Sequence, residues 1–255
     1  MQGAKVALTR ILAAAFALAL TTLGGTAGAQ QAGEGPGEAD IVAAFSGGWQ
    51  VFDDRYKANS STPCRLDLGD TPSDGRYPVR SQGCAGVLAD VREWGIDSGQ
   101  MTLFSEEQEI VVRLGGNQRR MTGNAVNGAP IILDSVGGNQ LADQVQVAVQ
   151  NEGCVYYGFT DRCARPAELS EPEGEDASNL NVIVNLNVRA EARADAELVG
   201  VVPQDTCIAA DLCATAADGV WCRAQFGERS GWMRQTAIRR NRWPVLTYTT
   251  GCTQE

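Results

Sequence analysis

Cysteine is the residue type whose number and spacing carry the most chemistry in this chain. The sequence contains eight cysteines, and an even number in an exported chain is typical of a disulfide framework. The alternative is a zinc site, whose Cys or His ligands usually stand at C-x₂-C or H-x₃-H spacing. The chain has no C-x₂-C spacing and no histidine. The sequence therefore predicts disulfides and no metal site, with the sulfur atoms supplied by Cys64, Cys84, Cys154, Cys163, Cys207, Cys213, Cys222 and Cys252.

The lack of histidine also bears on catalysis. It removes the Ser-His-Asp and Cys-His arrangements and the usual proton shuttle at physiological pH. Carboxylate pairs remain, such as Asp53 with Asp54 and Glu106 with Glu107, but a chain with 31 acidic residues produces such pairs by chance. We interpret them as solvated turn charges. Because phosphate-binding glycine loops are also absent from the sequence, we expect a protein that is not an enzyme and takes no cofactor.

The N-terminus indicates export. Lys5 and Arg10 precede an apolar run at residues 11–20, and small residues follow up to the A-x-A ending at residues 27–29. This order is typical of a cleaved secretory signal. The apolar run is shorter than the ~20 residues that cross a bilayer, so a membrane anchor is the less favoured alternative. We expect residues 1–29 to be a signal peptide and the protein to be periplasmic or secreted, without membrane insertion after cleavage.

Charge narrows the range of partners. The formal net charge is −10, and removal of the signal, which carries two cations and no acid, makes it −12. Such a surface repels nucleic acid and anionic lipid, so no nucleic-acid partner is expected. One basic cluster stands out, where Arg239, Arg240 and Arg242 adjoin Trp243. These side chains could stack on and pair with an anionic ligand; the alternative is a solvated edge.

Short alternating runs predict strands over most of the mature chain. Residues 30–39 have the composition of an exposed flexible arm, and a helical turn with Asp40 as its N-cap is expected at residues 40–45. Apolar residues between Cys84 and Trp94 fall at helical spacing and predict one or two further turns. The strand-like runs suggest an antiparallel barrel or sandwich; they are Trp49–Phe52, Cys64–Leu68, Tyr77–Arg80, Met101–Phe104, Ile110–Leu114, Met121–Ala125 and Pro130–Leu133.

Composition changes beyond residue 136. Val145, Val147 and Val149 alternate with polar or small residues ahead of a turn at residues 151–153, which predicts a hairpin with residues 154–159. Residues 166–178 are rich in acids, Pro, Gly and Ser and are expected to form a linker. Short strands return in residues 179–255. The expected organisation is therefore a barrel at residues 40–136, a hairpin and acidic linker at 137–178, and a second β domain at 179–255.

The C-terminal block resembles the bacterial SH3 family over roughly residues 180–240. The strings LNVRAEARADAELVG and GVWCRAQFGERSGWM match that family's L-N-V-R opening and its later Trp and G-W hairpin, with Met233 in place of the usual Val. The resemblance implies a small half-open barrel. In it Trp221 is expected in the core, whereas Trp232 follows a turn and is expected half exposed in a ligand groove. The candidate ligand-binding residues are Trp232, Arg239, Arg240 and Trp243.

The first β domain resembles the bacterial metalloprotease inhibitors of the alkaline-proteinase-inhibitor (Inh) type over residues 38–136. The motifs that carry this resemblance, in order, are SGGWQV (46–51), CRLDL (64–68), Cys84, Trp94, MTLF (101–104) and GAPIIL (128–133). The resemblance implies an eight-stranded antiparallel barrel closed by a Cys64–Cys84 disulfide. It also implies that the mature N-terminal arm enters the cleft of a zinc protease. That arm would begin with Gln30, Gln31, Ala32, Gly33 and Glu34.

This sequence departs from the inhibitor pattern in its arm, which is longer and richer in glycine. A neutral α-amine can offer its lone pair to zinc, but an N-terminal Gln can cyclise to a lactam without a basic nitrogen. Among the other cysteines, Cys213 and Cys222 flank a turn and are placed for a cross-strand bridge. A Cys207–Cys252 bridge would then hold the C-terminal tail, and Cys154–Cys163 follows by elimination.

Taken together, these patterns predict an exported all-β protein in two parts. The leading hypothesis is an inhibitor of a secreted or envelope protease, with zinc metalloproteases as the expected targets, joined to an SH3-like binding module for which peptidoglycan is a second expected partner. The rival is a non-inhibitory envelope scaffold that recognises peptidoglycan or a protein partner. A third, weaker class is an enzyme that uses a carboxylate pair.

Overall fold

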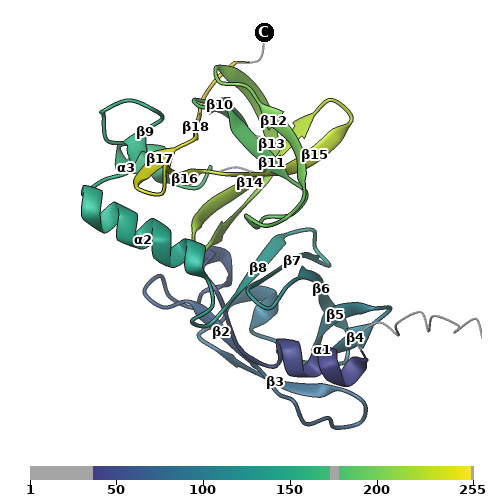
Figure 1. Cartoon of the computed structure of the whole chain (residues 1–255). Helices are drawn as coiled ribbons and strands as arrows, with labels where there is room; N and C mark the ends of the chain where they lie inside the picture. Colours follow the sequence, from purple (N-terminus) through teal and green to yellow (C-terminus); the bar gives the residue numbers. More distant parts are fainter. Residues whose placement is uncertain (1–36, 173–177, 254–255) are drawn as a thin grey trace, which may run out of the picture. The chain divides into compact units, whose positions relative to one another are not determined.

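Eight consecutive strands close into an antiparallel barrel in the first half of the chain (Figure 1). The structure is a computed structural model that describes residues 37–172 and 178–253. The predicted signal peptide and the arm residues Gln30–Glu34 lie outside the described residues. The barrel confirms the predicted fold class; its strands are β1 (Gly47–Val51), β2 (Cys64–Leu68), β3 (Tyr77–Gln82), β4 (Val91–Asp97), β5 (Gln100–Ser105), β6 (Ile110–Gly116), β7 (Arg120–Ala125) and β8 (Pro130–Ser135).

Alternation along the strands fills the barrel interior. In β2 the side chains of Cys64, Leu66 and Leu68 are buried, whereas Arg65 is exposed and Asp67 partly so. Barrels of about eight strands have an interior just wide enough for side chains to fill. Two tryptophans, Trp49 and Trp94, are buried there, and the Trp94 indole Nε1 donates to the carbonyl oxygen of Gly69 at 2.8 Å. The apolar residues whose alternation predicted the strands are therefore the residues that form the barrel core.

The segment between Cys84 and Trp94 partly confirms the helical turns predicted there. One 3₁₀ turn, η2 (Gly86–Leu88), forms, whereas Val91 already begins β4, so a second turn does not form. The register of β4 with β5 shifts between Val91 and Glu93. Such a bulge adds one residue to one strand. Val91 and Trp94 consequently both face the interior, and their separation of three residues imitates helical spacing.

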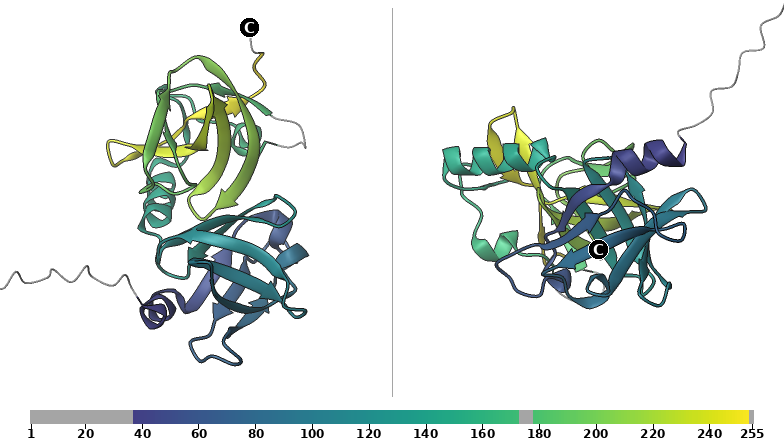
Figure 2. Two further views of the ribbon diagram at one scale, coloured as in Figure 1. Left: turned by 90° about the vertical axis from the view of Figure 1, so that its right-hand side faces the viewer. Right: turned by 90° about the horizontal axis from the view of Figure 1, so that it is seen from below.

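The N-terminal helix α1 (Glu38–Phe45) begins two residues earlier than predicted. Asp40 is not its N-cap: the carboxylate accepts a hydrogen bond from the Gly37 backbone N–H at 3.1 Å from within the first turn. Val42 is buried with the barrel core, and the Phe45 ring stacks on Trp49 with centroids 6.4 Å apart. Both views in Figure 2 show α1 against the barrel. The helix therefore anchors the chain at the point where the predicted arm ends.

The hairpin predicted after residue 136 is wrong, because residues Gln140–Glu152 form the helix α2. The Asn139 side chain accepts from the Ala142 N–H at 3.2 Å, and Gly153 ends the helix with a φ of 74°. Alternating valines fit a strand, but Val147 is 53% exposed while the neighbouring Ala148 is buried. The segment has a helix cap at each end, and the Ala and Gln residues between the caps favour a helix. These preferences outweigh the strand preference that the alternating valines indicate.

The segment between α2 and residue 172 forms one short strand and one short helix. Strand β9 (Tyr156–Tyr157) pairs in parallel with a later strand instead of forming the predicted hairpin. Helix α3 (Pro166–Leu169) occupies the start of the predicted acidic linker. Residues 173–177 of that linker lie outside the described ranges.

Two sheets make up the C-terminal half. The first has seven strands in the order β12-β11-β15-β14-β13-β10-β18, and the second has three in the order β16-β17-β9. Their strands are β10 (Ser178–Val182), β11 (Leu186–Arg189), β12 (Leu198–Val202), β13 (Thr206–Ala216), β14 (Gly219–Phe226), β15 (Arg229–Arg234), β16 (Thr236–Arg239), β17 (Trp243–Leu246) and β18 (Tyr248–Thr250). Leu180, Val188 and Met233 lie in the buried cluster of the larger sheet.

Four disulfides link the eight cysteines. The bridges are Cys64–Cys84, Cys154–Cys163, Cys207–Cys252 and Cys213–Cys222, which are the pairs that the sequence indicates. Disulfides form and persist in oxidising compartments, so the bridges suggest an extracytoplasmic location. Within the described ranges, no helix combines the length and apolar character needed to cross a bilayer.

Glu168 offers a test of the α3 segment through its pKa. Hydrogen bonds from the side chains of Arg165 and Arg162, at 2.7 Å and 3.0 Å, lower the pKa of its carboxyl to about 2. Because this pKa is below the unfolded value of ~4.3, the contact stabilises the fold above that pH and is lost as the pH falls towards about 2. An NMR titration of the Glu168 carboxyl carbon is expected to give a midpoint near about 2.

The matched variants for this titration are Arg165→Ala and Arg119→Ala. The first removes the largest cause of the shift, so the Glu168 midpoint should rise towards its ordinary value. The second removes an exposed arginine from the turn between β6 and β7 and should leave the midpoint in place. A midpoint near ~4.3 in the unaltered protein would contradict the contact.

Candidate functional site

The predicted ligand-binding residues do not form one site. Trp232 on β15 is half buried and packs with Ile132 of β8, Ala192 and Trp221. It lines a cavity of about 150 Å³. Arg239 lines a different cavity, and neither cavity is lined by Arg240 or Trp243. The structure therefore separates Trp232 from the basic cluster with which the sequence grouped it. Trp221 is buried, as expected of a core residue.

The basic cluster lies on the hairpin between β16 and β17. Arg239 and Trp243 are opposite each other in the register, and Arg240 is exposed in the turn with a φ of 51°. Arg242 pairs with Glu152 of α2 at 2.8 Å and its guanidinium lies 5.2 Å from the Trp243 ring centroid. Arg239 faces one cavity, where its guanidinium lies 4.1 Å over the Phe159 ring, and Arg242 lines a separate one together with Asp143 and Glu152 of α2.

The cavity that Arg239 faces, which we name the arginine pocket, has a volume of about 230 Å³. Three arginines line it: Arg189 at the end of β11, Arg234 at the end of β15 and Arg239 at the end of β16. No aspartate or glutamate is among the described residues that line it. The rest of the lining is aromatic, aliphatic, amide and hydroxyl-bearing; it comprises Phe159, Val184, Asn185, Leu186, Asn187, Ala194, Trp221, Ala237, Ile238, Val245 and Thr247.

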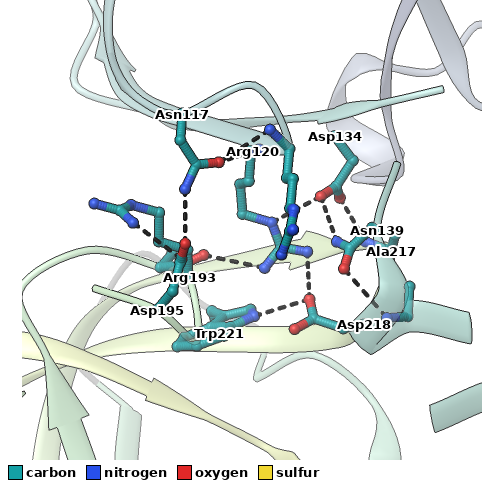
Figure 3. A network of polar contacts seen from close by, with 12 residues as sticks. Asn117, Arg120, Asp134, Asn139, Arg193, Asp195, Ala217, Asp218 and Trp221 are labelled. Atoms are coloured by element: carbon teal, nitrogen blue, oxygen red, sulfur yellow. Dashed lines mark hydrogen bonds and ion pairs between the residues drawn. The ribbon is translucent and has the colours of Figure 1, made fainter. Parts of the chain in front are cut away.

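A buried ion network (Figure 3) contacts the pocket residue Arg234 through Asp218. Arg120 of β7 is 3% exposed; its Nε donates to Asp134 of β8 at 2.7 Å and its Nη2 donates to Asp218 in the turn between β13 and β14. Burial opposes the guanidinium charge, but attraction to Asp218 and Asp134 more than offsets it and raises the pKa of Arg120. The network thus joins two barrel strands to the larger C-terminal sheet.

Backbone and side-chain donors complete the network. Asp134 accepts from Asn139 Nδ2 and from the Ala217 N–H, both at 2.8 Å. Asp218 accepts from Trp221 Nε1 at 3.1 Å through the same oxygen that binds Arg120. Buried carboxylates need such partners, since an unpaired buried charge is costly. Each aspartate therefore accepts hydrogen bonds from more than one donor.

Asp218 connects this network to the arginine pocket. Its second oxygen accepts from Arg234 Nη1 at 3.3 Å, and the Arg234 side chain is 15% exposed. Burial lowers the pKa of Arg234, attraction to Asp218 only partly opposes this, and repulsion from Arg120 and Arg189 adds to the lowering. The positive charge of Arg234 is therefore only partly compensated by the described residues around it.

Sequence reasoning missed Arg189 and Arg234. Both stand beside quoted motifs, since Arg189 ends LNVR and Arg234 directly follows the G-W-M turn. Their proximity depends on pairing: β11 pairs with β15 so that Arg189 lies opposite Trp232, two residues from Arg234. A basic residue at the end of each of the two quoted motifs was the available signal.

The described residues provide no metal centre. Across residues 37–172 and 178–253, no three Cys, Asp or Glu side chains are grouped so that they could hold a metal ion. In comparisons with known proteins, no family model and no curated protein matches the chain.

Proposed function

We propose that this protein is an exported protease inhibitor whose C-terminal half is an SH3-like binding module. The observation that supports the proposal is the closed barrel of β1–β8 carrying the Cys64–Cys84 bridge, the architecture expected from the inhibitor resemblance. The four disulfides are consistent with a location outside the cytoplasm, where such an inhibitor would meet its target.

The proposed inhibitory element is the mature arm that begins with Gln30, Gln31, Ala32, Gly33 and Glu34. An extended arm adds main-chain hydrogen bonds in a protease cleft, and a neutral α-amine approaches the zinc. Ordering the arm costs ~1–2 kcal/mol per residue. A rigid anchor close to the end of the arm therefore limits the number of residues that must become ordered on binding. Helix α1, which packs on the barrel from Glu38 onward, supplies that anchor.

The test is a titration of zinc proteases of the serralysin type with the mature protein. We expect stoichiometric loss of zinc-protease activity and no loss for a serine protease treated identically. A variant that begins at Gly37 keeps helix α1 and the barrel but lacks the arm, and it should not inhibit. Protein with a cyclised Gln30 should inhibit more weakly than protein with a free amine, because the lactam nitrogen cannot ligate zinc. Absence of inhibition at micromolar excess would refute the proposal.

The second candidate is an envelope scaffold that binds peptidoglycan or a protein partner without inhibition. The arginine pocket favours it, because a cationic cavity in an acidic protein is a feature that core packing does not require. Retention on peptidoglycan together with a negative protease titration would support this candidate. Arg239→Gln tests the arginine pocket, and Trp232→Ala is the comparison variant in a different cavity.

A further inference from the structure

We infer that the arginine pocket binds the carboxylate group of a small or chain-terminal ligand. The inference concerns the C-terminal sheets and does not depend on protease inhibition. It starts from the three guanidinium groups of Arg189, Arg234 and Arg239, which line one cavity from the ends of three strands.

Two of these cations have no ion-pair partner among the described residues. Arg189 donates through Nη1 to the carbonyl oxygen of Ala196 at 2.9 Å, and Arg239 lies over the Phe159 ring. A carbonyl oxygen and a ring face attract a guanidinium but carry no net charge. In a chain with 31 acidic residues, carboxylates that could neutralise these cations are plentiful, yet none lines the pocket.

The third cation is 15% exposed and shares the one ion-pair partner that it has among the described residues. Arg234 pairs with Asp218 at 3.3 Å, whereas Asp218 also binds Arg120 at shorter range. Arg234 consequently experiences repulsion from Arg120 and Arg189 with only a shared carboxylate to offset it. Electrostatic attraction is stronger where water is partly excluded. An anion that enters the pocket would relieve this repulsion and gain attraction from all three guanidinium groups.

The dimensions and walls of the pocket indicate the class of anion. At about 230 Å³ it is smaller than the ~300–1,000 Å³ of ordinary small-molecule sites, so it fits a compact ligand or one end of a longer one. The guanidinium fork matches the planar carboxylate in a bidentate arrangement. Aliphatic walls at Val184, Leu186 and Ile238 suit a small apolar substituent, and the Asn185 and Asn187 amides can pair with an adjoining peptide group.

The experiment measures binding of N-acetyl-Ala-Ala to the mature protein by NMR chemical-shift titration at low ionic strength. Its C-terminal amide serves as the neutral analogue, and inorganic phosphate as a non-carboxylate anion. We expect saturable shifts for the free acid at resonances of the arginine pocket and binding roughly tenfold or more weaker for the amide, since it lacks the charge. Equal binding of acid and amide, or binding of phosphate alone, would overturn the inference.

Variants locate the site. Arg189→Gln and Arg239→Gln each remove one charge and should weaken binding of the free acid roughly tenfold, because hydrogen bonds to charged groups are the stronger ones. Arg240→Gln is the matched control: it neutralises an exposed neighbour of Arg239 that does not line the pocket, and it should bind as the parent does.

Two further readouts keep the interpretation clear. An intact amide spectrum shows that each variant has folded. The variant that begins at Gly37 should bind the acid as the full mature protein does, even though it lacks the arm proposed for inhibition. If Arg240→Gln weakens binding as much as Arg239→Gln, the effect reflects overall charge and the pocket assignment fails.

Discussion

Replacing Arg120 with methionine is expected to lower the free energy of unfolding by about 3–5 kcal/mol, the cost of breaking a buried ion pair by removal of one partner. The substitution leaves Asp134 without its ion-pair partner and Asp218 with Arg234 alone, and the side chains of both aspartates are fully buried. It also removes the hydrogen bond to the Ala192 carbonyl oxygen at 3.1 Å. Methionine fills a similar volume, so the loss measures mainly the uncompensated charge.

Urea unfolding followed by tryptophan fluorescence measures this loss as a change in midpoint at constant slope. Arg113→Met is the control, because it removes an arginine of the neighbouring strand β6 that forms an exposed ion pair with Asp97. The Arg113 side chain is 43% exposed and the Asp97 side chain 40%. Exposed pairs contribute about 0–1 kcal/mol. If Arg120→Met costs no more than Arg113→Met, the buried network does not stabilise the fold in the way argued.

Loss of the Cys207–Cys252 bridge is the second large effect. The double replacement by alanine should lower the free energy of unfolding by about 4 kcal/mol, because the bridge closes a separation of 45 residues and longer loops gain more on the chain-entropy argument. The bridge holds the C-terminal tail beside β18, a strand of three residues whose Tyr248 is buried. Without it, this short strand is held by its pairing with β10 and by the burial of Tyr248.

The comparison is the double replacement of Cys154 and Cys163 by alanine. The bridge between these two cysteines closes a separation of only nine residues. On the same argument it should cost about 2.6 kcal/mol, so the order of the two losses is the test. Thermal or urea unfolding of both variants under non-reducing conditions provides the numbers. An equal or reversed order would mean that loop length does not govern the contribution of these bridges.

Asp218 links stability to the inferred binding site. It neutralises Arg120 within the network and is the ion-pair partner of Arg234 at the pocket wall. Asp218 and Asp134 together match the charges of Arg120 and Arg234, so the network is neutral as a whole. The uncompensated positive charge at the pocket is therefore that of Arg189 and Arg239, which have no ion-pair partner among the described residues.

The sequence by itself determined the β character and seven of the eight barrel strands, and it suggested an oxidising compartment. Alternation in runs such as Cys64–Leu68 specifies which side chains face inward, because successive side chains of a strand point to opposite faces. Cysteine number and the A-x-A ending indicate an oxidising location without any knowledge of contacts. These features are local, so a single pass along the chain can find them.

The tertiary structure decided the conformation of segments whose local pattern fits both a helix and a strand. It also decided which residues that are distant in the sequence come into contact. The valines of α2 fit both a strand and a helix, and the bulge in β4 gave Val91 and Trp94 a helical spacing. Arg120 and Asp218 are 98 residues apart, and the arginine pocket is built from the ends of three strands. Charge compensation depends on which side chains become neighbours when sheets pair and pack, and no local pattern in the sequence records that.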